Sequence, residues 1–202
     1  NERAPFRSGF STVPPMMVGR DDLLDDLADR MTFLPAQYAI TGPRGFGKTV
    51  LLRTVQRRLD AAGVLTLWHT CDRNTPVAEL LANKAVELAA TRASVKDRFA
   101  RHVSERLRIG VDAVINLQWE PRSSPQAVLS STLDALAAAA ANDSTTVVVF
   151  LDEIHTLDHS DELVQLSQAL SDASGQDLAI GVLVAGLWLP ASPPTRGASF
   201  IE

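Results

Sequence analysis

The chain has 202 residues, and its 19 Lys and Arg against 24 Asp and Glu give a net charge of −5 when His is neutral. Apolar types make up 46% of it, which excludes a largely disordered chain because that much apolar surface can bury a core. A single cysteine, Cys71, excludes an internal disulfide framework and a zinc site built from several cysteines. No apolar run reaches the ~20 residues of a membrane span, and the first residues lack the order of a secretory signal. We therefore expect a cytoplasmic protein with no membrane partner.

The predicted elements alternate between helices and strands. Helices are predicted from residue 21 to before Pro35 and over 49–62, 76–91, 94–108, 125–141 and 161–173. Strands are predicted over 38–41, 64–68, 145–151 and 179–185. Thr75 followed by Pro76 predicts an N-cap with Pro at the first helical position, and imperfect alternation over 110–119 favours a strand or hairpin insertion. Strands that alternate with helices indicate an α/β fold with a parallel sheet.

One loop carries the chemistry of phosphate binding. Residues 42–49 match the pattern G-x-x-x-x-G-K-[ST], with a predicted strand before them and a predicted helix after them. Glycines let backbone N–H groups turn onto phosphate oxygens, and the helix N-terminus adds partial positive charge. Lys48 can reach the β- and γ-phosphates, and the Thr49 hydroxyl can join the shell of a Mg²⁺ ion. The predicted site for ATP or ADP consists of Gly42, Pro43, Arg44, Gly45, Phe46, Gly47, Lys48, Thr49 and Val50.

A second motif places two carboxylates after a strand. The apolar run 145–151 is followed by Asp152 and Glu153. The carboxyl ends of parallel strands form the crevice in which α/β sheets bind ligands. Asp152 is suited to hold Mg²⁺, and Glu153 is suited to orient and deprotonate an attacking water. The alternative is a strand-end pair that merely caps the next turn. It is less favoured because a complete phosphate loop precedes the pair in the chain.

These segments resemble AAA+-type P-loop ATPases of the initiator/STAND-like group. The resemblance rests on GPRGFGKTVLL at 42–52, VVVFLDEIHTL at 147–157 and VGRDDLLDDL at 18–27, and it spans roughly residues 5–187. It implies a three-layer P-loop NTPase sandwich with a mostly parallel sheet in the order 5-1-4-3-2, and it places Val18 and Gly19 near the adenine.

The number of predicted strands sets the expected domain organisation. Because four strands are predicted, we expect the nucleotide-binding core without its C-terminal lid and with the fifth strand absent. The expected division is an extended arm over 1–17, a P-loop ATPase core over 18–189 and a loose tail over 190–202.

Two functions stay open at this point. The first is an AAA+ domain that hydrolyses Mg-ATP to drive conformational change of a partner or assembly. The second is a nucleotide-dependent switch with little turnover. It is favoured because the last predicted strand ends in Ala185 and Gly186, where such ATPases commonly place a polar residue.

Other residues carry weaker signals. The stretch 92–108 is basic, and we favour a solvated helix face over a DNA-contacting one, so that DNA has less support than a homo-oligomer or a protein partner. We expect His155 to be an exposed turn residue rather than a polar group near the site. Cys71 is expected to be a thiol at the edge of the core, and Trp68 a core or interface aromatic.

Overall fold

The computed structural model describes residues 21–33, 36–107, 124–157, 161–174 and 180–187. The predicted arm, the residues Val18 and Gly19, the insertion over 110–119 and the predicted tail lie outside these described residues.

The elements follow the predicted order, and the predicted boundaries differ from the observed ones by a residue or two. The helices are α1 (Asp21–Phe33), α2 (Lys48–Ala61), α3 (Val77–Thr91), α4 (Ala93–Leu107), α6 (Pro125–Ala141), the short 3₁₀ helix η1 (Ile154–Leu157) and α7 (Asp161–Ser174). The strands are β1 (Gln37–Thr41), β2 (Leu65–Thr70), β3 (Val147–Asp152) and β4 (Ile180–Gly186).

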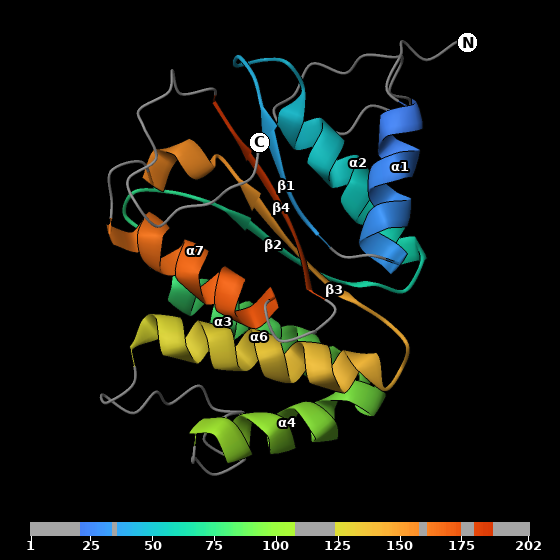
Figure 1. Ribbon diagram of the computed structural model, residues 1–202, viewed down its shortest axis with the longest axis vertical. Helices are drawn as coiled ribbons and strands as arrows, with labels where there is room; N and C mark the ends of the chain where they lie inside the picture. The colour runs from blue at the N-terminus through green and yellow to red at the C-terminus, as the bar shows by residue number, and fades with distance from the viewer. Residues whose placement is uncertain (1–20, 34–35, 108–123, 158–160, 175–179, 188–202) are drawn as a thin grey trace, which may run out of the picture.

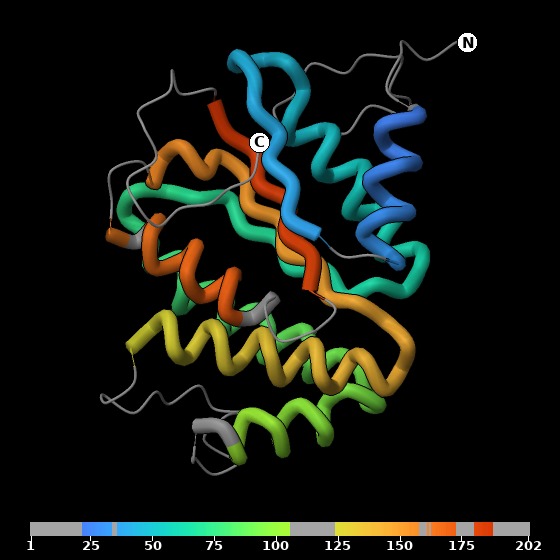
Figure 2. The backbone as a smooth tube through the Cα atoms, in the orientation of Figure 1, coloured from blue at the N-terminus to red at the C-terminus, as the bar shows by residue number. Residues whose placement is uncertain are grey.

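The described strands form one parallel sheet in the order β1-β4-β3-β2. This confirms the predicted α/β class and matches the order 1-4-3-2 within the expected AAA+ sheet. Helices α1 and α2 cover one face, helices α3, α6 and α7 cover the other, and α4 packs outside α6 (Figure 1). The tube view shows β4 running between β1 and β3 through the centre of the molecule (Figure 2).

The two central strands are buried along their whole length, as predicted for strands that helices cover on both faces. Phe150 of β3 joins the apolar cluster beneath α1 and α2, and its neighbour Val149 joins the cluster beneath α3, α6 and α7. This alternation follows from the period of a strand, whose successive side chains point to opposite faces. Cys71 is 3% exposed, which confirms a buried thiol beside the sheet.

The predicted N-cap of α3 is wrong by one residue. Pro76 holds the cap position, and the helix begins at Val77. Asp72 forms a turn just before it: its carboxylate accepts a hydrogen bond from the Asn74 N–H at 2.9 Å, and its carbonyl accepts one from Thr75 N–H at 3.3 Å. Because this turn engages the backbone of Thr75, the chain enters the helix one residue later than the Thr-Pro pattern predicts.

A buried histidine and a lysine meet at strand β2, which lies at one side of the sheet. The Nζ of Lys84, on α3, donates to the Trp68 carbonyl at 2.6 Å and lies 3.4 Å from Nδ1 of His69. Burial, together with the charge of Lys84, lowers the pKa of His69, which is 6% exposed.

The lowered pKa of His69 predicts a loss of stability on acidification. The unfolded chain binds a proton near the ordinary value of ~6.5, whereas the folded chain resists it. The stability that comes from the neutral ring is therefore complete above that value and is lost as the pH falls toward the folded-state pKa. Urea unfolding at stepped pH should show a steeper loss below about pH 6.5 in the wild type than in His69→Leu. Parallel profiles would contradict the prediction.

Candidate active site

The loop between β1 and α2 has the backbone that a phosphate loop requires. Gly45 and Gly47 have φ angles of 86° and 79°, in the left-handed region that favours glycine. Gly47 is the N-cap of α2, so the first N–H groups of the helix, which have no partner within the helix, lie at the end of this loop. Such N–H groups bind anions, and the helix dipole adds to the attraction.

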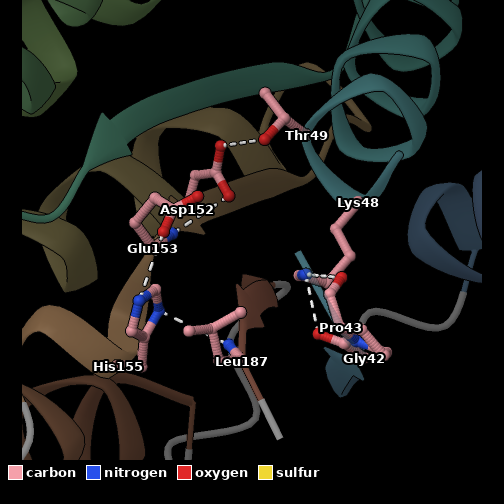
Figure 3. Close-up of polar contacts among 8 residues, drawn as sticks. All are labelled: Gly42, Pro43, Lys48, Thr49, Asp152, Glu153, His155 and Leu187. Atoms are coloured by element: carbon pink, nitrogen blue, oxygen red, sulfur yellow. Dashed lines mark hydrogen bonds and ion pairs between the residues drawn. The ribbon is translucent and has the colours of Figure 1, made fainter. Parts of the chain in front are cut away.

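Lys48 lies across this loop. Its Nζ donates to the carbonyl oxygens of Gly42 and Pro43, at 2.8 Å and 2.9 Å, as Figure 3 shows. The ammonium group is thereby held over the loop on a flexible stem whose three donors can be redirected to phosphate oxygens.

Thr49 and Asp152 meet although they are far apart in the sequence. The Thr49 hydroxyl donates to Oδ2 of Asp152 at 2.7 Å, and Oδ1 of Asp152 accepts from the Glu153 N–H at 3.0 Å (Figure 3). Asp152 is 3% exposed at the end of β3. A hydroxyl and a carboxylate side by side fit Mg²⁺, which prefers oxygen ligands.

Phosphate and water would complete the shell of such an ion. Within the described part of the chain, no group of three or more His, Cys, Asp or Glu side chains could hold a metal by itself. Mg²⁺ commonly keeps several waters and binds through one or two protein ligands together with substrate phosphates.

A pocket of about 430 Å³ joins the loop to the ends of β3 and β4. Glu153 lines it with a φ of 57°, an uncommon conformation for a residue other than glycine. Its side chain is 46% exposed. The lining residues are Arg44, Gly45, Gly47, Lys48, Thr49, Glu153, His155, Thr156 and Leu187.

The predicted site residues are thus mostly brought together. Gly42 and Pro43 contribute carbonyls to the loop, and Asp152 lies behind the pocket against Thr49. Phe46 is 60% exposed on the loop, and Val50 lies in the first turn of α2; neither is among the lining residues. The predicted contacts of Val18 and Gly19 with the adenine remain predictions.

His155 was predicted to be an exposed turn residue, and this is wrong. It lies in η1, its side chain is 20% exposed, and it lines the pocket. η1 packs closely against the end of β4, where a Cβ added to Gly186 would lie 2.9 Å from Cγ2 of Ile154. The apolar residues Ile154 and Leu157, three apart, are the sequence signal for a 3₁₀ turn with one face on the core.

Two further residues near the site were not singled out by the sequence. The guanidinium of Arg53, one turn after Thr49 on α2, lies 3.5 Å from the ring centroid of Trp68. That ring stacks on Phe150 with centroids 5.8 Å apart, in accord with the predicted packing role of Trp68. Burial lowers the pKa of Arg53, and the Asp152 carboxylate partly offsets this.

The hydroxyl of Thr156 is buried, and no hydrogen-bond partner reaches it within the described residues.

The chain belongs to the AAA ATPase domain family, whose model matches residues 17–184. This membership implies nucleotide binding. In a comparison with curated proteins, none matches the chain.

Two solved structures are similar to it. The first is the Aeropyrum pernix ORC2 protein in ADPNP–ADP complexes, with a TM-score of 0.51 and 19% identity over 89% of this chain and 43% of that one. The second is the ORC1 protein of the same organism in complex with DNA, with a TM-score of 0.49 and 18% identity over 88% of this chain and 41% of that one. The chain therefore spans less than half the length of these proteins. The likeness to the ORC2 protein shows the fold alone.

Among the described residues, no helix combines the length and the apolar character needed to cross a bilayer.

The left-handed glycines predict separable effects on stability and binding. Gly47→Ala and Gly63→Ala both force a side chain into the left-handed region, with φ near 79° and 83° and nothing within 4 Å of the added Cβ. Each should lower the free energy of unfolding of the nucleotide-free protein by about 1–2 kcal/mol. Gly47→Ala alone should also weaken ADP binding, by about tenfold, because the loop relaxes out of its phosphate-binding shape. Equal affinities of the two variants, measured by calorimetry, would argue against that role for the loop.

Proposed function

We propose that this chain is a Mg²⁺-dependent ATPase domain that hydrolyses ATP to ADP and phosphate and uses the cycle to rearrange a partner or an assembly. Family membership supports the binding of a nucleotide. The proposal of hydrolysis rests on one observation, the convergence of Lys48, Thr49, Asp152 and Glu153 around a single pocket edge.

Each of these side chains has a role in the proposed reaction. The loop N–H groups and Lys48 bind the phosphates, with the ammonium moving from the loop carbonyls to the β- and γ-phosphate oxygens. Thr49 and Asp152 would hold Mg²⁺, which would neutralise charge that develops on the phosphate oxygens. Glu153 takes a proton from water as the oxygen of that water bonds to the γ-phosphorus. The bond from the γ-phosphorus to the bridging oxygen breaks, and that oxygen leaves with ADP.

A nucleotide-dependent switch with little turnover is the second candidate. It is favoured by the end of β4, where Ala185, Gly186 and Leu187 present no polar side chain to the pocket. A switch would bind ATP and ADP with the same loop and would release them with almost no hydrolysis.

Two substitutions separate binding from hydrolysis. Glu153→Gln should keep ATP binding and lower the turnover by about 10²–10⁴-fold, because the amide cannot accept the proton. Lys48→Ala should weaken ATP binding itself, because a cation at the phosphates is lost. Lys96→Ala, which removes an exposed cation of α4, is the matched control and should change neither quantity. Phosphate release and ATP titration measure the two effects.

The outcomes decide between the two candidates. Unchanged turnover in Glu153→Gln would remove this residue from the mechanism. A wild type that binds ATP but releases phosphate no faster than Lys48→Ala would favour the switch.

For the partner, we propose a second copy of the chain or another protein rather than DNA. On α4, Arg98 forms an ion pair with Asp143, so its charge is already partnered within the fold. The exposed cations Lys96 and Arg101 alternate with acidic residues on the same helix. This mixed face gives less attraction to phosphate backbones than the sequence count implies.

We further propose that a neighbouring copy of the chain supplies an arginine to the γ-phosphate, as the resemblance to AAA+-type ATPases implies. In related phosphoryl-transfer systems such an arginine is worth on the order of 10³–10⁵ in rate. Turnover per chain should therefore rise with protein concentration, with Lys48→Ala as the blank. Turnover per chain that stays constant above the blank would indicate a site complete within one chain.

A further inference from the structure

The end of β4 lies between the two halves of the pocket. Gly186 pairs with Thr41, the last residue before the phosphate loop, and Val184 pairs with Leu151, next to Asp152. A polar side chain at this point would reach water in the pocket. β4 offers none there, and Gly186 has no room for a side chain because η1 lies against it. The polar group at this place comes instead from η1.

That group is the imidazole of His155, which joins two elements of the pocket. Its Nδ1 accepts a hydrogen bond from the Leu187 N–H at 3.4 Å, and its Nε2 lies 3.4 Å from Oε2 of Glu153 (Figure 3). A neutral imidazole has one N–H and one acceptor nitrogen. Because the backbone N–H takes the acceptor at Nδ1, the ring proton is on Nε2 and faces the carboxylate of Glu153.

The two side chains differ in how firmly they are held. The carboxylate of Glu153 is 46% exposed at the end of a flexible side chain, whereas His155 is 20% exposed. η1 is fixed by its close approach to Gly186 and by a hydrogen bond from Thr156 N–H to the Glu153 carbonyl at 2.9 Å. A hydrogen bond from the held ring to the free carboxylate restricts the positions that the carboxylate samples. Both contacts are long, as catalytic hydrogen bonds often are before substrate binds.

We propose that His155 is a positioning residue, which directs the carboxylate of Glu153 to the attacking water and takes the place of the polar residue that β4 lacks. This role rests on the proposed hydrolysis. It acts through Glu153, so it changes turnover and leaves nucleotide affinity alone, because the phosphates are bound by the loop on the other side of the pocket.

Two substitutions each retain one of the two hydrogen-bonding groups of the imidazole. Gln places an amide N–H near the position of Nε2 and keeps the donor to Glu153. Asn places a carbonyl oxygen near the position of Nδ1 and keeps the acceptor for the Leu187 N–H. We expect His155→Gln to keep kcat within about threefold of the wild type and His155→Asn to lower it by about 10–100-fold, with KM for ATP changed by less than about twofold in both. In the Glu153→Gln background, His155→Asn should have no further effect.

The results separate this role from the proposed function. If His155 merely holds the backbone of β4, His155→Asn keeps kcat and His155→Gln loses it, which overturns the role alone. If the wild type shows no turnover above Lys48→Ala, the proposed hydrolysis fails and the role fails with it.

A measurement without turnover tests the same geometry. Ring ¹⁵N spectra of the ADP-bound protein at about pH 8, with the signal of His155 assigned by its loss in His155→Gln, should show the proton on Nε2. A proton on Nδ1 would overturn the role even in an active enzyme.

Discussion

The parallel pairing of β4 with β1 on one side and β3 on the other sets the distance across the pocket. Neighbouring strands lie about 4.8 Å apart, so the phosphate loop and the acidic pair start from strand ends roughly 10 Å apart. The loop then turns back, and α2 brings the Thr49 hydroxyl to 2.7 Å from Asp152. Because β4 is buried on both faces, a displacement of this strand would move both halves of the site at once.

The helix that follows the loop is held more firmly than the loop itself. Leu52, Val55 and Leu59 of α2 are fully buried against the sheet, and Arg53 lies over the ring of Trp68. The loop glycines, in contrast, have open space where a side chain would lie. A fixed helix with an open loop at its start keeps the N–H groups oriented and leaves room for phosphates to approach the backbone.

The sequence predicted those parts of the site whose chemistry is local. The loop pattern at 42–49 and the acidic pair after a buried run each carry their own signal, and the structure brings Lys48, Thr49, Asp152 and Glu153 together. The strand order came from the resemblance, because hydrophobic periodicity does not say which strands are neighbours. Packing between distant segments could not be predicted from the sequence. The place of His155 depends on Gly186, which follows it in the chain after a helix and a strand.

The same dependence explains why a histidine on η1 can stand in for a polar residue on β4. A side chain on β4 would reach the pocket from a strand that is separate from the base. His155 instead belongs to the segment that carries Glu153, and the hydrogen bond from the Leu187 N–H to its Nδ1 ties that segment to the residue that follows β4. In the proposed mechanism the orientation of the base therefore depends on where β4 ends, while the grip on the phosphates depends on the loop and α2. Nucleotide binding and hydrolysis are thus assigned to two different structural units. A change in one unit can therefore alter one activity and leave the other unchanged.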